Sequence, residues 1–64
     1  MANKKWFIVP SESGLNLREE PSLDAKILDV FAWNDKIEAD NDVEAPEGWL
    51  PVKGGGFVMR EFVK

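Results

Sequence analysis

The segment Leu15-Asn16-Leu17-Arg18-Glu19-Glu20-Pro21-Ser22 alternates apolar and polar residues over its first four positions and then reaches a proline. Alternation with a period of two is typical of a half-buried β-strand, and a turn led by proline ends one. The segment therefore predicts a short strand over Leu15–Arg18 that enters a loop. Leu15 and Leu17 are expected to face a core, with the polar residues between them on the opposite face.

Residues that favour turns recur on both sides of this strand, about every eight to twelve residues. Such spacing is typical of several short strands in a small sandwich or barrel. The expected strands are Trp6 to Val9, Leu15 to Arg18, Ile27 to Trp33, Lys36 to Asp40, Trp49 to Lys53 and Gly56 to Val58, and a single helical turn is expected over Met59 to Glu61. A long helix is disfavoured because no stretch keeps a 3.6-residue period between caps.

Two local features refine this prediction. Asn34-Asp35 separates two apolar runs and predicts a tight hairpin turn, because asparagine tolerates the left-handed backbone conformation. Ile27, Leu28 and Val30, followed by Phe31, cannot all lie on one face of a regular strand. We therefore expect a β-bulge or strong coiling in that strand.

The Leu15–Ser22 segment, Gly48-Trp49 and Gly56-Phe57-Val58 together resemble the bacterial Src-homology-3-like (SH3b) family. The pattern of that family is a leucine-asparagine-valine-arginine strand with a proline-serine loop, a glycine-tryptophan strand and a closing glycine-aromatic-valine strand. The resemblance covers about residues 6 to 63, and Asn34 stands where the family usually has glycine. It implies an all-β fold, a small SH3-like barrel of five to six short antiparallel strands with one helical turn near the C-terminus. Residues 1–5 are then a flexible N-terminal tail, and residues 6–64 form one barrel domain.

Composition narrows the classes of function. The chain has 64 residues, a net charge of −4, and no cysteine, histidine or tyrosine. We expect no disulfide, because there is no cysteine, and no enzyme activity or cofactor, because the three serines have no histidine to act as their base. The acidic charge disfavours nucleic acid as a partner.

Asp40-Asn41-Asp42 resembles the start of a calcium loop, but Ala45 and Pro51 occupy the positions that need glycine and glutamate, so we expect no metal site. Neither a signal peptide nor a stretch long enough to span a membrane is present in the sequence. The protein is expected to be cytoplasmic if the chain is complete, and to belong to the cell wall or the extracellular space if it was excised from a larger protein.

The candidate binding residues are Trp49, Phe62, Trp33, Met59, Arg18 and Glu20. By position in the family, Trp49 and Phe62 would wall a ligand groove with Met59 as its floor, whereas the alternative places Phe62 in the core. Trp33 stands where the family usually has lysine, and it is interpreted either as a partner contact or as a lid over the barrel end.

Arg18 could bind a ligand carboxylate, or it could pair with Glu20 or Asp24 and hold the loop that follows. The loop-fixing role is favoured for Asn16 and Arg18. Glu19, Glu20 and Asp24 in that loop are candidates to face a basic group on a partner.

These features favour a non-catalytic binding module, expected to be a monomer with no nucleic-acid or membrane partner. The resemblance implies a peptide ligand, including the peptides of cell-wall peptidoglycan. The alternative is a stand-alone intracellular interaction protein, for example one encoded by a phage, that docks on a host protein. Its acidic residues Glu38, Asp40, Asp42, Glu44 and Glu47 would steer it to a basic surface. Recognition of proline-rich peptides is a weaker option, because the tyrosines that complete such a groove are missing.

Overall fold

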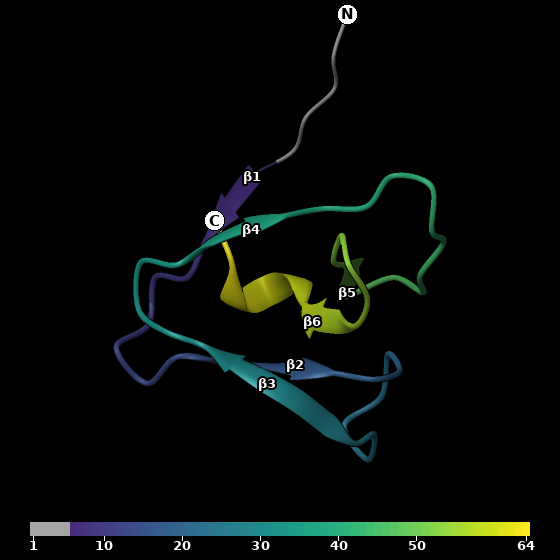
Figure 1. The fold of residues 1–64 in the computed structure, drawn as a ribbon, viewed down its shortest axis with the longest axis horizontal. Helices are drawn as coiled ribbons and strands as arrows, with labels where there is room; N and C mark the ends of the chain where they lie inside the picture. Colours follow the sequence, from purple (N-terminus) through teal and green to yellow (C-terminus); the bar gives the residue numbers. More distant parts are fainter. Residues whose placement is uncertain (1–5) are drawn as a thin grey trace, which may run out of the picture.

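The computed structural model describes residues 6–64, and within them the chain forms six short strands and one 3₁₀ turn (Figure 1). The elements are β1 (Trp6–Ile8), β2 (Leu15–Arg18), β3 (Ile27–Phe31), β4 (Lys36–Glu38), β5 (Trp49–Pro51), β6 (Phe57–Met59) and the 3₁₀ turn η1 (Arg60–Phe62). All strand pairs are antiparallel. The predicted fold class, a small all-β barrel with one helical turn near the C-terminus, is confirmed. The predicted tail, residues 1–5, lies outside the described residues.

The strands form two sheets that are joined edge to edge. One sheet has the order β1-β4 and the other the order β3-β2-β6-β5. A β-bridge between Ala39 and Val52 links β4 to β5 across the two sheets. At the other side of β1, Ile8 and Lys64 exchange two main-chain hydrogen bonds of 2.8 and 3.0 Å. The C-terminus therefore lies beside β1 and extends the smaller sheet (Figure 1).

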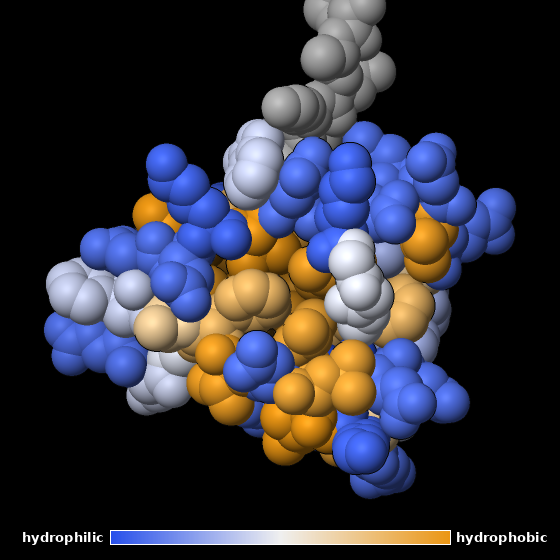
Figure 2. Space-filling model, in the orientation of Figure 1, coloured by the Kyte–Doolittle hydropathy of each residue, from blue (hydrophilic) through white to orange (hydrophobic). Residues whose placement is uncertain are grey.

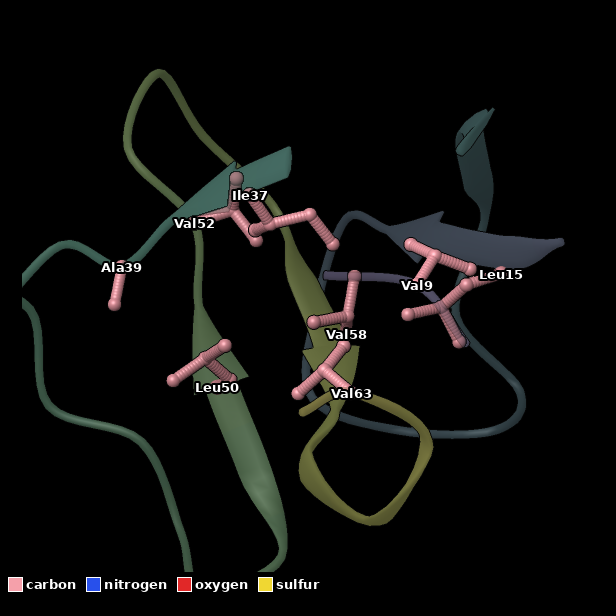
Figure 3. Close-up of a cluster of buried hydrophobic side chains, with 8 residues drawn as sticks. All are labelled: Val9, Leu15, Ile37, Ala39, Leu50, Val52, Val58 and Val63. Atoms are coloured by element: carbon pink, nitrogen blue, oxygen red, sulfur yellow. The ribbon is translucent and has the colours of Figure 1, made fainter. Parts of the chain in front are cut away.

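The core consists of eight aliphatic side chains that point toward one another from opposite walls of the barrel (Figure 3). They are Val9, Leu15, Ile37, Ala39, Leu50, Val52, Val58 and Val63. Leu50 and Val52 face inward, whereas Trp49, the first residue of β5, lies on the opposite face and does not join the core. A core of this size is small, so each of its side chains carries a large share of the stability.

The predicted bulge and the left-handed turn are confirmed, but the turn forms no hairpin, because β3 and β4 belong to different sheets and do not pair. Asn34 has φ of 69°, the left-handed conformation expected for the turn after β3. Leu17 pairs with Asp29 and Arg18 pairs with Ile27, so Leu28 is the extra residue of a β-bulge. The bulge does not turn the strand's aliphatic side chains into the core, because Ile27, Leu28 and Val30 are all about half exposed.

The ends of the elements differ from the sequence-based prediction by a few residues. β3, β4 and β5 are each two residues shorter than expected, and their missing ends are turns or the isolated Ala39–Val52 bridge. The helical turn begins at Arg60 and includes Phe62, one residue later than predicted, because β6 continues through Met59. Because of this shift by one residue, Phe62 belongs to the 3₁₀ turn and does not follow it.

Candidate functional site

Trp49 lies at the start of β5, with its side chain on the face opposite the core. Its cross-strand partner on β6 is Met59, and the neighbouring pair is Pro51 with Phe57. Residues that lie opposite each other in antiparallel strands project to the same face. The structure therefore brings Trp49 and Met59 together, as predicted, within a half-buried apolar face of β5 and β6.

A hollow of about 330 Å³ opens beside Trp49, between β5 and the loop that follows β4. We call it the Trp49 hollow; its lining residues are Phe7, Ala39, Asp40, Asn41, Val43, Ala45, Trp49, Leu50, Pro51 and Arg60. This volume is near the lower end of the range found for ligand sites, about 300–1,000 Å³. The hollow can therefore accept one or two side chains of a peptide.

The loop of the hollow is acidic. Asp40 is half-buried, and its Oδ1 accepts a hydrogen bond of 3.0 Å from the main-chain N–H of Asp42, which fixes a local turn. Asp42, Glu44 and Glu47 are exposed along the same loop. The loop beside the hollow therefore carries four carboxylates, and their field favours cations near this loop.

Arg60 is the cation that lines the hollow, and an aromatic ring holds it. Its guanidinium lies over the ring of Phe7, with Cζ 4.6 Å from the ring centroid. An arginine over an aromatic face is attracted by the negative potential of the ring. The Arg60 main-chain N–H also donates to the Gly48 carbonyl at 2.9 Å, which ties η1 to the start of β5.

Phe62 does not share the Trp49 hollow. Its ring is 46% exposed, so it is not part of the core, and it lines a second hollow of about 360 Å³. The residues of this Phe62 hollow are Ser11, Ser13, Gly14, Leu15, Asn16 and Phe62. Because a 3₁₀ turn rotates the chain by about 120° per residue, Arg60 and Phe62 project to different sides. The single groove expected between Trp49 and Phe62 is thus divided into two hollows.

Trp33 lies outside both hollows. It precedes the left-handed Asn34 and is 54% exposed, so it is not part of the core. Trp6 lies on β1 and is 51% exposed, so it is not a core residue. Contact of Trp33 with a partner stays a prediction.

Arg18 holds the loop between β2 and β3. Its Nη1 donates to the main-chain carbonyls of Leu23 and Ala25 at 2.9 and 3.1 Å. The loop-fixing role is therefore seen, but the acceptors are carbonyls and not the carboxylates of Glu20 or Asp24. Ligand contacts by Arg18 and by the exposed Glu20 stay predictions. Asn16, expected to help hold the loop, makes no side-chain hydrogen bond to residues 6–64, and it lines the Phe62 hollow.

Replacement of Arg18 by alanine is expected to loosen this loop while the barrel remains folded. The change removes two hydrogen bonds from a charged, half-buried donor, and we expect a loss of about 1–2 kcal/mol in the free energy of unfolding. Amide hydrogen exchange should become faster from residue 19 to residue 26 and stay unchanged in β5 and β6. Lys26→Ala, at an exposed position of the same loop, is the control. Unchanged exchange in the Arg18 variant would show that the loop does not depend on the guanidinium.

Comparison with known proteins adds no identification. No family model matches the chain, and neither a curated protein nor a solved structure matches it. In the part of the chain from residue 6 onward, helices of the length and apolar character required to cross a membrane are not found.

Proposed function

We propose that this chain is a non-catalytic binding module of bacterial SH3 type, and that its ligand is a peptide, including the peptide of cell-wall peptidoglycan. The observation that carries the proposal is the Trp49 hollow: an outward indole beside an acidic loop, on a face that the core does not use. The order of strands and the 3₁₀ turn after β6 support the assignment to this class.

The chemistry of the hollow indicates which part of a peptide enters it. Trp49, Pro51 and Val43 offer apolar surface, and Asp40 offers a carboxylate beside them. Lysine and arginine side chains match this combination, because their apolar stems cover hydrophobic surface while their charged ends reach a carboxylate or an aromatic face. The ligand is therefore a peptide that presents a cationic side chain.

A second candidate function is docking on a host protein inside the cell. It is favoured by the three exposed carboxylates along the loop, Asp42, Glu44 and Glu47, which extend the negative field beyond the hollow. Such a field raises the rate of encounter with a basic surface, and added salt screens it. Both candidates use the same hollow, and they differ in whether the cationic group belongs to the cell wall or to a folded protein.

Binding assays with two tryptophan variants test the proposal. Wild type, Trp49→Ala and Trp33→Ala are incubated with purified bacterial cell walls and, separately, with a lysine-rich hexapeptide. Because truncation of a central aromatic residue typically costs about 2 kcal/mol, Trp49→Ala is expected to weaken binding about thirtyfold. Trp33→Ala is the comparison variant: Trp33 is exposed and lies outside the hollow, so a loss of binding in this variant alone would assign the contact to Trp33.

The outcomes separate the candidates. Retention on walls that is lost with Trp49→Ala supports the cell-wall ligand. Failure on several wall types, combined with peptide binding that added salt weakens, supports docking on a basic protein. If neither walls nor the cationic peptide bind, or if Trp49→Ala binds as well as wild type, the proposed site is wrong.

A further inference from the structure

The outer edge of β3 is an open edge of the four-stranded sheet within residues 6–64. β3 pairs with β2 on one side and has no strand on the other. The Lys26 carbonyl accepts a hydrogen bond of 2.8 Å from Glu19, so it points toward the β2 side. Since main-chain groups alternate along a strand, the N–H and C=O of Ile27 point outward, away from β2. Asn16 pairs with Val30, and the Val30 N–H also points outward, because its hydrogen bond goes to a side chain of β3 itself.

This edge is unusually apolar for a surface strand. Val30 is 56% exposed and Ile27 is 46% exposed, and Leu28 and Leu23 beside them are exposed to a similar extent. Figure 2 shows hydrophobic side chains gathered on the surface in the region where β2 and β3 lie in Figure 1. An exposed, apolar edge strand is a template for pairing with another chain, and natural proteins usually protect it.

The edge is also self-complementary. Because of the bulge at Leu28, the side chains of Ile27 and Val30 lie on the same face of the sheet. The main-chain N–H and C=O groups of both residues point away from β2, toward the open edge. If a second β3 approaches antiparallel about a two-fold axis, Ile27 of each copy lies opposite Val30 of the other. The pairing then brings two sets of main-chain hydrogen bonds and two aliphatic cross-strand pairs.

One side chain obstructs this pairing. Oδ1 of Asp29 accepts a hydrogen bond of 2.7 Å from the Val30 N–H, the donor that a second strand would need. Asp29 is exposed, so its carboxylate also places a negative charge at the edge. We propose that the outer edge of β3 is a pairing surface for a second copy of this chain, and that Asp29 keeps it closed by occupying the Val30 N–H.

Removal of the carboxylate opens the edge. Asp29→Ala frees the Val30 N–H and leaves the aliphatic side chains in place. Because the symmetric dimer contains two freed Val30 N–H groups, one from each copy, its dissociation constant is expected to fall by about thirtyfold. Sedimentation equilibrium at matched concentrations measures it. Asp24→Ala is the control, because it removes the same charge from an exposed position before β3 and leaves the Val30 N–H bonded.

Two further variants test whether release of the Val30 N–H is what allows the dimer to form. Asp29→Asn retains an acceptor oxygen at the same place, so it is expected to remain as monomeric as wild type. Asp29→Ala combined with Val30→Lys places a charge at the centre of the pairing surface and is expected to restore the monomer. Circular dichroism of each variant verifies the β-fold before the comparison.

Three results would overturn the proposal. The first is a folded Asp29→Ala variant with the same dimer constant as wild type. The second is an Asp24→Ala variant that dimerises equally, which would assign the effect to net charge. The third is an Asp29→Ala dimer that persists in the Val30→Lys double variant, which would place the interface elsewhere. If Asp29→Ala fails to fold, Asp29→Val provides the comparison, because it also removes the acceptor oxygens and suits a strand.

Discussion

Replacement of Val58 by alanine is expected to lower the free energy of unfolding by about 2–3 kcal/mol. Val58 is fully buried at the centre of β6, where it contacts the core from the middle of the four-stranded sheet (Figure 3). Truncation removes two methyl groups from water-excluded contacts and leaves a cavity, because the flanking strands cannot collapse without losing their pairing.

The expected loss is large relative to the total free energy of unfolding of this domain. The core of a domain this small rarely supplies more than about 3–5 kcal/mol, so Val58→Ala should leave a substantial unfolded fraction at 25 °C. Urea denaturation followed by far-ultraviolet circular dichroism measures the change. Val30→Ala is the matched control, since the same chemical change at a residue that is 56% exposed should cost less than about 0.5 kcal/mol. Equal losses at the two positions would contradict the location of the core.

The second large effect is expected at Gly14, in the turn before β2. Gly14 has φ of 82°, and a Cβ added there would lie 2.6 Å from the main-chain oxygen of Phe31. Alanine would therefore meet both a disfavoured backbone conformation and a clash with main chain on β3. We expect Gly14→Ala to cost about 3 kcal/mol or more, or to displace the end of β3 from β2.

Gly48→Ala separates the two causes. Gly48 has φ of 93°, and a Cβ built there would meet nothing within 4 Å. This variant carries the backbone cost alone, expected to be about 1–2 kcal/mol. Thermal unfolding of the two variants beside wild type gives the difference. Similar losses at Gly14 and Gly48 would show that the Phe31 carbonyl moves away without cost.

Local sequence patterns predicted most of the fold. The alternation of Leu15–Arg18 predicted β2 correctly. Asn34 indicated the turn after β3, because few other residues adopt a positive φ at low energetic cost. The crowding of aliphatic residues from 27 to 31 indicated a bulge. These features depend on residues that are close together in the chain, so they can be predicted from the sequence alone.

The exposure of β3 was not predictable in the same way. Ile27, Leu28 and Val30 have the composition of a core strand, yet the structure places β3 at the outside of its sheet. Which strand lies at an edge depends on the order of strands in space, and no local period encodes that order. Asp29 interrupts the run in the sequence, but its hydrogen bond to Val30 is visible only in the structure.

The candidate site was predicted in part. The positions of Trp49 and Met59 on one face follow from alternation along β5 and β6. Phe7 and Arg60 were missed, because they reach the Trp49 hollow through pairing of β1 with β4 and through the turn η1. The separation of Phe62 from Trp49 arises from a shift of η1 by one residue, and element ends are the least determined feature of a sequence pattern.

The central claim is that the Trp49 hollow receives a cationic side chain of a peptide. Titration of the isotopically labelled protein with the lysine-rich hexapeptide, followed by amide chemical shifts, tests it most directly, with a glutamate-rich hexapeptide as control. Saturable shifts are expected at residues 40 to 45, at the Trp49 indole N–H and at Arg60, and none of this size with the acidic peptide. Saturable shifts confined to the Phe62 hollow or to β3, or equal shifts with both peptides, would contradict it.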